Sequence, residues 1–324
     1  MLEISEVDFQ PQREMVSMTP VKLLRYGKQV LLWFLIVVLL LYPVAACAPV
    51  SVSVWEQLPF PVDDVIWCLA IDPNDSQILY AGTGVYDTGH GVFKSTDGGV
   101  YKSTNGGTSW VVSAKGLPKC FVNYLVIDPV NSQTLYAGTD GDGVFKSTDG
   151  GSNWVSSFNG LPDGFVNCLA IDPVNSQTLY AGTTNEVFKS NDGGLNWVSS
   201  STGLTHKDVF CLAIDPNNSQ ILYVGTYHHG VFKNSDSGTS WVYSSSGLMA
   251  GDVLYLAIDP VNSQTIYAGT LGYGVYKSSD SGTSWTDLSS GLKNSFVHSL
   301  TIDPSNPQTV YAGTESRVFR ITLK

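Results

Sequence analysis

Five tryptophans recur at a nearly constant interval in this 324-residue chain. They are 44, 43, 44 and 44 residues apart, at Trp110, Trp154, Trp197, Trp241 and Trp285. Each closes a stretch of the general form Ser-x-Asp-x-Gly-x-x-Trp. A period of this length is typical of one structural unit copied around a ring or along a solenoid. The interval therefore constrains the fold more than any single residue does.

Each copy contains four short runs rich in Val, Ile, Leu, Tyr, Phe and Trp, separated by Asp-Pro, Asn-Ser, Gly-Thr and Asp-Gly-Gly. Apolar runs between turn-forming residues indicate strands. Four strands in about 40 to 50 residues make one β-propeller blade. We therefore predict an all-β, six-bladed β-propeller of four-stranded antiparallel blades. The first run of each copy is apolar almost throughout, which favours an inner strand covered on both faces.

Five copies are complete and a sixth is cut short. The complete copies span 65–117, 122–161, 166–204, 209–248 and 253–292. The sixth begins at Val297 and ends after three predicted strands at Lys324. Residues 52–58 precede the first copy, and Trp55 matches the repeated tryptophan. We expect this segment to form the missing outer strand, because closure removes an open sheet edge.

The stretches before the repeated tryptophans, residues 103–110, 147–154, 190–197, 234–241 and 278–285, are named here the tryptophan hairpins. Their key positions are Asn105, Trp110, Asp149, Trp154, Asp192, Trp197, Asp236, Trp241, Asp280 and Trp285. A carboxylate or amide that accepts backbone N–H bonds stabilises such a turn, and the tryptophan anchors it to the blade. We predict structural roles for these ten residues. The pattern resembles the bacterial neuraminidase repeat, or Asp-box, of sialidases, photosystem II stability and assembly factors and many secreted bacterial propellers, over about residues 52–324.

The resemblance implies a propeller and says little about activity. Sialidases of this family bind the substrate carboxylate with three arginines, because guanidinium groups pair with carboxylates in a bidentate geometry. The predicted propeller contains only Arg317 and Arg320, in one strand. We therefore expect no sialidase activity and assign no catalytic residue. Other glycoside hydrolases need only two carboxylates about 5 to 10 Å apart.

Blade topology separates two rims. The Ile-Asp-Pro turns and the tryptophan hairpins fall on one rim, and the loops after Ala-Gly-Thr and the linkers after Gly-Leu fall on the other, named here the recognition rim. The copies differ at the recognition rim, where the candidate binding residues are Tyr86, Asp87, His90, Asp140, Asp142, Glu186, Tyr227, His228, His229, Tyr273 and Glu315. Such side chains suit a sugar or a protein segment. An ordinary solvated loop rim is the other interpretation.

No metal or cofactor is expected at these residues. Adjacent residues at a strand end, such as His228 and His229, face opposite sides. The Asp140-Gly141-Asp142-Gly143 stretch lacks the later ligands of a calcium loop.

The N-terminal region differs from the repeats. Residues Val30–Tyr42 are thirteen uninterrupted apolar residues with basic residues before them. Thirteen residues fit a signal-peptide core and are short for a membrane span of about 20. The following Val44-Ala45-Ala46-Cys47 resembles a bacterial lipobox, which predicts lipidation of Cys47. An uncleaved anchor and an ordinary cleaved signal stay open, and all three place the propeller outside the cytoplasm.

Three segments are therefore predicted: a cytoplasmic or leader n-region at 1–29, with Met15 or Met18 as alternative starts, a signal peptide or anchor at 30–47, and the propeller at 48–324. Residues 48–324 hold 13 basic and 24 acidic side chains, so the predicted propeller carries the whole net charge of −11. Nucleic acid would be repelled. We expect a monomer whose partner is a protein or a glycan, and which reaches the membrane through its N-terminal lipid or anchor.

Two further features leave alternatives. Cys68, Cys168 and Cys211 share one repeat position, which favours buried small side chains over disulfides, and Cys120 lies in a linker. Residues 91–98 are repeated almost unchanged as 99–106, which predicts a lengthened loop or, alternatively, a functional insertion. The N-terminal region and the predicted propeller together favour an exported, membrane-tethered, non-catalytic scaffold for recognition or assembly. The alternative is a glycan-active hydrolase or carbohydrate-binding protein of the cell envelope.

Overall fold

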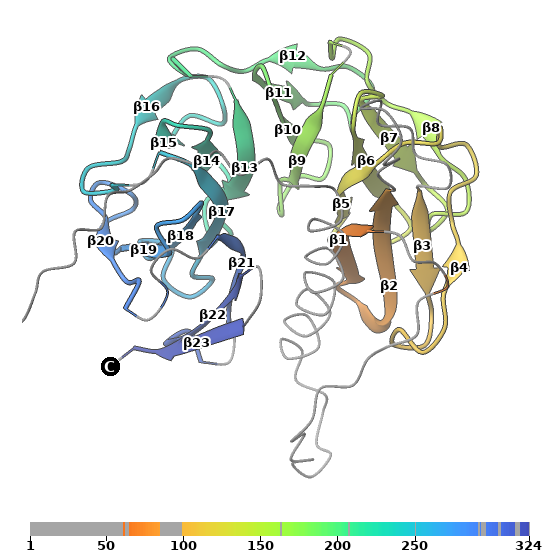
Figure 1. The fold of residues 1–324 in the computed structure, drawn as a ribbon. Helices are drawn as coiled ribbons and strands as arrows, with labels where there is room; N and C mark the ends of the chain where they lie inside the picture. The colour runs from red at the N-terminus through yellow and green to blue at the C-terminus, as the bar shows by residue number, and fades with distance from the viewer. Residues whose placement is uncertain are drawn as a thin grey trace, which may run out of the picture.

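The computed structural model describes residues 61, 65–84, 99–162, 164–206, 208–249, 251–290, 292, 296–303, 306–314 and 318–323. Every regular element in these residues is a β-strand (Figure 1). The strands form six antiparallel sheets, five of four strands and one of three. The predicted six-bladed β-propeller is thereby confirmed. Within the same residues, no helix is long and apolar enough to cross a bilayer.

Each blade is a meander whose strands follow chain order. The first three blades comprise β1 (Val65–Asp72), β2 (Asp75–Gly84), β3 (Val100–Ser103) and β4 (Val111–Val112); β5 (Val122–Ile127), β6 (Leu135–Thr139), β7 (Val144–Ser147) and β8 (Val155–Ser156); and β9 (Val166–Ile171), β10 (Leu179–Thr183), β11 (Val187–Ser190) and β12 (Val198–Ser199). The others comprise β13 (Val209–Ile214), β14 (Leu222–Thr226), β15 (Gly230–Asn234) and β16 (Trp241–Tyr243); β17 (Val253–Ile258), β18 (Ile266–Thr270), β19 (Val275–Ser278) and β20 (Thr286–Asp287); and β21 (Val297–Ile302), β22 (Thr309–Thr314) and β23 (Val318–Thr322).

The first strands of successive blades pack side by side in the order β1, β5, β9, β13, β17 and β21, around the centre of the ring (Figure 1). The sixth sheet ends with β23, as its incomplete copy predicts. Residues 52–58 lie outside the described residues, so their role as the closing strand stays a prediction. In the first blade, the second of the two tandem copies supplies β3, while residues 85–98 lie outside the described part.

Burial within a blade differs from expectation in one respect. Every residue of the second strands β6, β10, β14 and β18 is buried, whereas each of the first strands β5, β9, β13 and β17 combines buried positions with partly or fully exposed ones. The first strand faces the centre of the ring with part of its surface, and neighbouring blades cover the second strand on both faces. The apolar first strands are therefore less completely covered than predicted.

Four blade interfaces repeat the same polar contact, named here the Tyr–Lys clasp. At one of them, the Tyr136 hydroxyl and the Lys146 ammonium both donate to the carbonyl oxygen of Gly193 in the next blade, at 2.9 and 2.8 Å. The ammonium also lies 5.2 Å from the centre of the Tyr136 ring, and burial lowers the pKa of Lys146. The other three clasps join Tyr80 and Lys102 to Gly150, Tyr180 and Lys189 to Ser237, and Tyr223 and Lys233 to Ser281.

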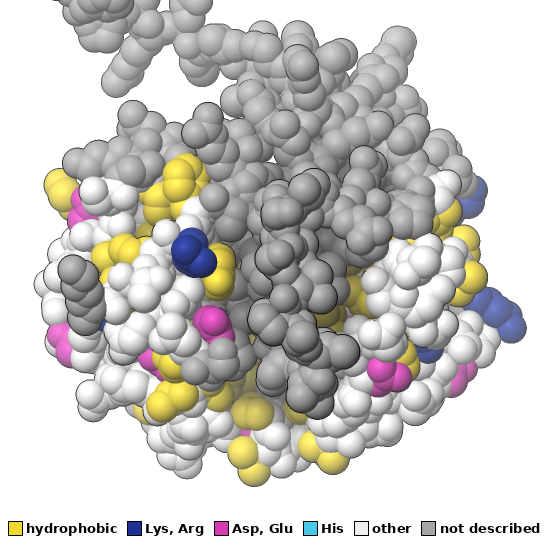
Figure 2. Space-filling view, turned by 90° about the horizontal axis from the view of Figure 1, so that it is seen from below, with side chains coloured by type: hydrophobic (Ala, Val, Ile, Leu, Met, Phe, Trp, Pro, Cys, Tyr) yellow, Lys and Arg dark blue, Asp and Glu magenta, His cyan; other side chains and the backbone are white. Residues whose placement is uncertain are grey.

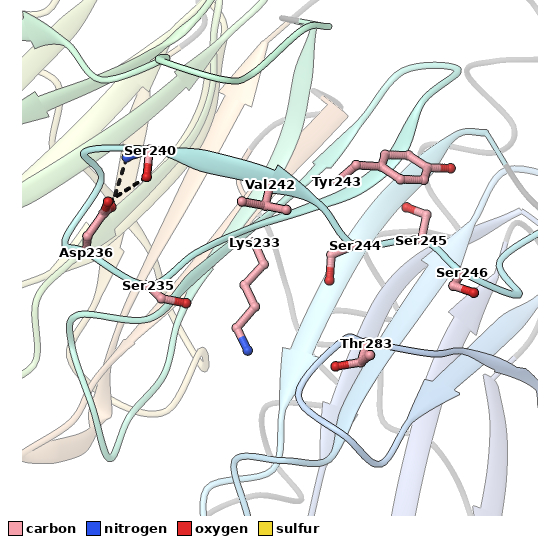
Figure 3. Close-up of a pocket in the computed structure, with 10 residues that line it drawn as sticks. All are labelled: Lys233, Ser235, Asp236, Ser240, Val242, Tyr243, Ser244, Ser245, Ser246 and Thr283. Atoms are coloured by element: carbon pink, nitrogen blue, oxygen red, sulfur yellow. Dashed lines mark hydrogen bonds between the residues drawn. The ribbon is translucent and has the colours of Figure 1, made fainter.

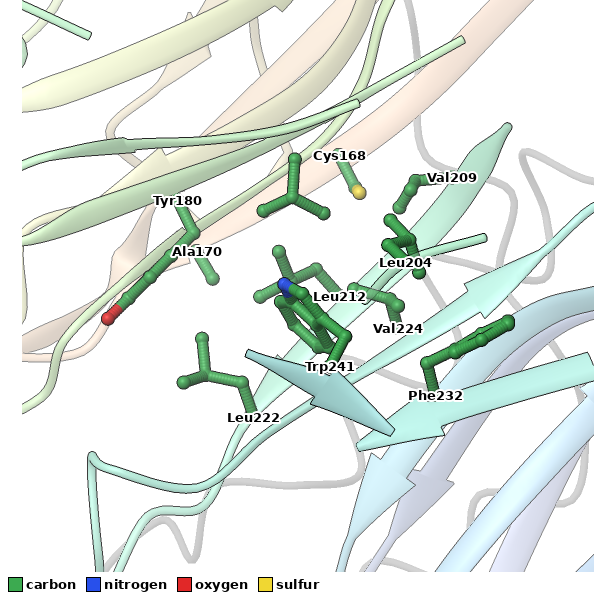
Figure 4. Close-up of a cluster of buried hydrophobic side chains, with 11 residues drawn as sticks. Cys168, Ala170, Tyr180, Leu204, Val209, Leu212, Leu222, Val224, Phe232 and Trp241 are labelled. Atoms are coloured by element: carbon green, nitrogen blue, oxygen red, sulfur yellow. The ribbon is translucent and has the colours of Figure 1, made fainter. Parts of the chain in front are cut away.

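The repeated tryptophans hold the same interfaces together. The Trp241 indole donates to the carbonyl of Ser200 in the preceding blade at 2.6 Å, and packs in a buried cluster with Tyr180 and Cys168 of that blade (Figure 4). Trp154, Trp197 and Trp285 donate in the same way to Ser113, Ser157 and Ser244. Trp110 instead donates to Gly107 in its own hairpin. Each of these four indoles therefore belongs to the core of two blades.

Candidate functional site

The recognition rim brings loops and linkers of the same blade into contact. The Asp140 amide donates to the Phe121 carbonyl at 3.0 Å, Tyr227 to Asp208 at 2.9 Å and Leu271 to Asp252 at 3.1 Å. In blades 2, 4 and 5 the loop after the second strand therefore bonds to the linker that enters the same blade. These backbone bonds fix the positions of loops that differ in sequence.

Blade 4 carries the densest group of candidate side chains. The Asp252 carboxylate accepts the His228 amide at 2.6 Å and lies 2.9 Å from Nδ1 of the same histidine. The ring of Tyr227 contacts His228, with centroids 3.5 Å apart, and meets Phe210 edge-on at 5.6 Å. His228 adopts a left-handed φ of 62°, a conformation uncommon outside glycine. An acidic residue and three rings are thus held together at the rim.

The second histidine of this loop faces another linker. The rings of His206 and His229 are stacked, with centroids 3.1 Å apart. The Nδ1 of His229 donates to the Tyr227 carbonyl at 2.9 Å. Burial, and then the neighbouring His229, lower the pKa of His206. His228 and His229 therefore point to different partners, and the described residues contain no group of three or more potential metal ligands.

Blade 2 places one of its two candidate carboxylates, Asp142, at the edge of a hollow. Burial, and then the charge of Asp142, raise the pKa of Asp140. Burial, followed by these two aspartates, raises the pKa of the Cys120 thiol to about 12, which disfavours the nucleophilic thiolate form. Asp142, Phe145 and Phe158 line an open hollow of about 500 Å³, in which the two aromatic rings meet edge-on at 6.3 Å.

Blades 3 and 5 present different residues at equivalent places. The Glu186 carboxylate accepts the Ser199 hydroxyl of its own outer strand, so it is directed toward the periphery. The Tyr273 side chain is 55% exposed, while its carbonyl accepts the Ser289 hydroxyl at 2.8 Å. Tyr273 is thus an exposed ring on a fixed backbone.

Exposed aromatic rings concentrate on the recognition rim. Among the described residues the exposed aromatic side chains there are Phe165, Phe210, Tyr227 and Tyr273, and Tyr243 on β16 is the exception. Phe165 and Phe210 were not among the sequence candidates. Phe165 immediately precedes β9, and Phe210 is the second residue of β13, whose apolar run predicts a buried strand.

A larger hollow lies at the periphery, between the outer part of blade 4 and the hairpin of blade 5 (Figure 3). It measures about 640 Å³ and is lined by Lys233, Ser235, Asp236, Ser240, Val242, Tyr243, Ser244, Ser245, Ser246 and Thr283. Most of its polar groups already bind the protein: Ser244 donates to Gly282, Lys233 to Ser281 and Ser240 to Asp236. Sequence reasoning did not single it out, because its residues come from the repeated scaffold.

The predicted structural aspartates bond within their own hairpins. Asp149 accepts the Asn153 side chain at 2.7 Å and the Asn153 amide at 2.8 Å. These bonds, the side-chain one first, lower the pKa of Asp149 to about 2. Asp192 and Asp280 have the same arrangement and a pKa of about 2, and in Asp236 the pKa is also lowered.

Several predicted residues lie outside the described part of the chain: Cys47, Tyr86, Asp87, His90 and Glu315. Of the two propeller arginines, Arg320 pairs with Tyr311 between β23 and β22, and Arg317 is outside it. Cys68, Cys120, Cys168 and Cys211 are buried and form no disulfide. Figure 2 shows Lys, Arg, Asp and Glu side chains dispersed over the described part of one face.

Fold and rim together define a six-bladed β-propeller with a regular scaffold and an irregular loop face. No family model and no curated protein matches the sequence. Solved structures share its fold. A GH74 enzyme of Niastella koreensis is 22% identical with a TM-score of 0.64, and the match covers 79% of this chain and 44% of that one. The chain thus spans less than half the length of that enzyme.

Two further structures resemble this chain over most of its length. The extracellular domain of BT4673 from B. thetaiotaomicron is 18% identical with a TM-score of 0.63, covering 82% of this chain and 33% of that one. YCF48, solved with a bound D1 peptide, is 14% identical with a TM-score of 0.60, covering 83% and 82%. At these identities the likeness shows the shared fold alone.

Proposed function

We propose that this protein is an extracytoplasmic, non-catalytic recognition scaffold that binds a protein segment or a glycan on its recognition rim. One observation carries the proposal: four of the five exposed aromatic side chains of the described residues gather on the rim where the blades differ. Exposed rings beside carboxylates and imidazoles are the groups that anchor sugars and peptides.

The rest of the scaffold supports the same assignment. The polar residues of the opposite rim, such as Asp149, bond within their own hairpins, which leaves them little capacity for a ligand. YCF48, a propeller of similar length, was solved with a bound peptide. The Asp-box resemblance points in the same direction, since the family includes assembly factors. The net charge of −11 disfavours polyanions as partners.

Binding would be tested with a glycan array and with affinity capture from native cell envelope. Tyr227→Ala and Tyr273→Ala are the test variants, and Tyr243→Ala is the matched control, an exposed ring away from the rim. Each test variant should weaken capture by about 1 to 3 kcal/mol, the cost of losing a buried aromatic anchor, with unchanged melting temperature. Two silent test variants together with a Tyr243 variant that abolishes binding would contradict the proposal.

Export and tethering form a second part of the proposal, resting on the apolar run and the sequence Val44-Ala45-Ala46-Cys47. If Cys47 is lipidated, Cys47→Ser should leave the precursor uncleaved or release the protein from the membrane. Mass spectrometry of the wild-type N-terminus is the measurement. An intact, unmodified N-terminus at Met1 or Met18 would refute lipidation and favour an uncleaved anchor.

The glycan-hydrolase alternative rests on Asp140, whose pKa is raised by burial and then by Asp142. Asp142 itself lines a hollow together with two aromatic rings. A carboxyl with a raised pKa is the form that a general acid requires. The test is release of reducing sugar from xyloglucan and other plant or bacterial glycans by wild type and by Asp140→Asn. Turnover that this substitution abolishes would establish the hydrolase, whereas no turnover with measurable glycan binding supports the scaffold.

A further inference from the structure

The interface between the fifth and sixth blades contains an apolar cavity of about 120 Å³. Its lining is mostly apolar, with Val275, Leu292, Leu300, Val310, Ala312 and Phe319 among the lining residues, and Ser290 and Arg320 as the polar ones. Leu300, Val310 and Ala312 are buried. An apolar cavity of roughly 150 Å³ takes a benzene ring, and this space of about 120 Å³ is close to that size, so it accepts most of the six-membered ring of an aromatic side chain.

The other interfaces identify the kind of ring. Between blades 1 and 2, Trp154 packs in a buried cluster with residues at the same repeat positions as the cavity lining. The matching positions are Val100 for Val275, Leu117 for Leu292, Leu125 for Leu300, Leu135 for Val310, Ala137 for Ala312 and Phe145 for Phe319. The clusters at the next three interfaces contain Trp197, Trp241 and Trp285. The cluster at the fifth interface has the same lining, and no tryptophan among the described residues enters it.

The chain carries one tryptophan with the matching position in sequence. From Trp110, Trp154, Trp197, Trp241 and Trp285, the first strand of the next blade begins 12 residues later, at Val122, Val166, Val209, Val253 and Val297. Trp55 stands 11 residues before Ile66, which pairs with Thr83 as Val122 pairs with Thr139. Within one residue of the repeat spacing, Trp55 therefore stands where a tryptophan of the blade before the first would stand, and in a closed ring that blade is the sixth.

We propose that the cavity is an indole socket and that Trp55 of the same chain fills it. The four interfaces that contain a tryptophan also indicate which polar contacts Trp55 makes. The Trp55 indole donates to the carbonyl of Leu288, which stands three residues after Trp285 as Ser113 stands three residues after Trp110. The carbonyl of Ser51, four residues before Trp55, accepts the fifth Tyr–Lys clasp from Tyr267 and Lys277.

The test is a double-mutant cycle on the melting temperature of the full-length chain, using Trp55→Ala and Phe319→Ala. Trp55→Ala should lower the melting temperature by roughly 10 °C, as expected when a buried tryptophan is truncated. The double variant should lose clearly less than the sum of the single losses, because the two residues share one cavity. Trp154→Ala with Phe145→Ala is the matched positive control, and Trp55→Ala with Phe145→Ala should be additive.

If Trp55→Ala does not fold, amide hydrogen exchange provides a second test. The milder Trp55→Phe should speed exchange of the β23 amides relative to those of β20, whereas Trp33→Phe should not. Unchanged melting of Trp55→Ala, additive losses in the Trp55 and Phe319 cycle, or unaltered β23 exchange would each overturn the proposal. So would a dimeric molar mass that falls to that of a monomer in Trp55→Ala, because the occupant would then be a second copy.

Discussion

Trp154 shows, at the scale of one residue, how the blades are joined. Its side chain is 3% exposed and its indole donates to Ser113 of the preceding blade at 2.7 Å. Trp154→Ala should therefore lower the free energy of unfolding by about 3 to 5 kcal/mol, and Trp154→Phe by less, because the ring remains. Urea unfolding measures both. A loss of ligand binding with unchanged stability would contradict the structural role.

The hairpin aspartates predict an acid dependence of stability. Hydrogen bonds lower the folded pKa of Asp149, Asp192 and Asp280 to about 2, below about 3.9 for an aspartate in an unfolded chain. Their contribution is therefore fully present above pH 4 and is lost as the pH falls toward 2. In a variant with all three of these aspartates replaced by asparagine, the free energy of unfolding should depend less on pH across this window than in the wild type. Parallel pH profiles from urea unfolding would contradict the assignment.

Glycine in the second strands lets neighbouring blades approach. A Cβ at Gly182 would lie 2.5 Å from Sγ of Cys168 and 2.6 Å from Cγ1 of Val209 in the next blade. Gly182→Ala should therefore cost about 1 to 3 kcal/mol of stability, and Val209→Ala in the same chain should recover part of it. Gly164→Ala is the control, because the nearest atom lies 3.8 Å away. Equal melting temperatures for the Gly182 and Gly164 variants would show that the blades are not closely packed there.

The elements were predictable from sequence because their signals are repeated and local. Alternation of apolar runs with Asp-Pro and Asp-Gly-Gly turns defines each strand, and the 43- to 44-residue interval defines the blade. Contacts across blades were not predictable in this way. The Tyr–Lys clasp on Gly193 joins residues 47 and 57 positions away, and the stacking of His206 on His229 depends on how two loops meet. Spacing alone specifies neither.

At the scale of the whole molecule, the same topology separates scaffold from variation. One rim carries the tryptophan hairpins, whose polar groups bond within the hairpin. The other rim carries Asp140, Tyr227 and Tyr273. The side chains of its loops differ from blade to blade, while the same loop-to-linker backbone bond recurs in blades 2, 4 and 5. An asymmetric face on a pseudo-symmetric ring is the requirement for recognising an asymmetric partner. Sequence comparison of the copies predicts a binding face here, and it does not predict the exposed rings of Phe165 and Phe210, which the structure adds to the same rim.

The central claim, binding on the recognition rim, is tested most directly by hydrogen exchange on the protein with and without its captured partner. The account predicts slower amide exchange in the loops around Asp140, Tyr227 and Leu271, whose backbone amides bond to the entering linkers. Exchange in the opposite rim, around Asn175 and Ser152, should stay unchanged. Protection confined to Asn175, Ser152 and their neighbours would contradict the account.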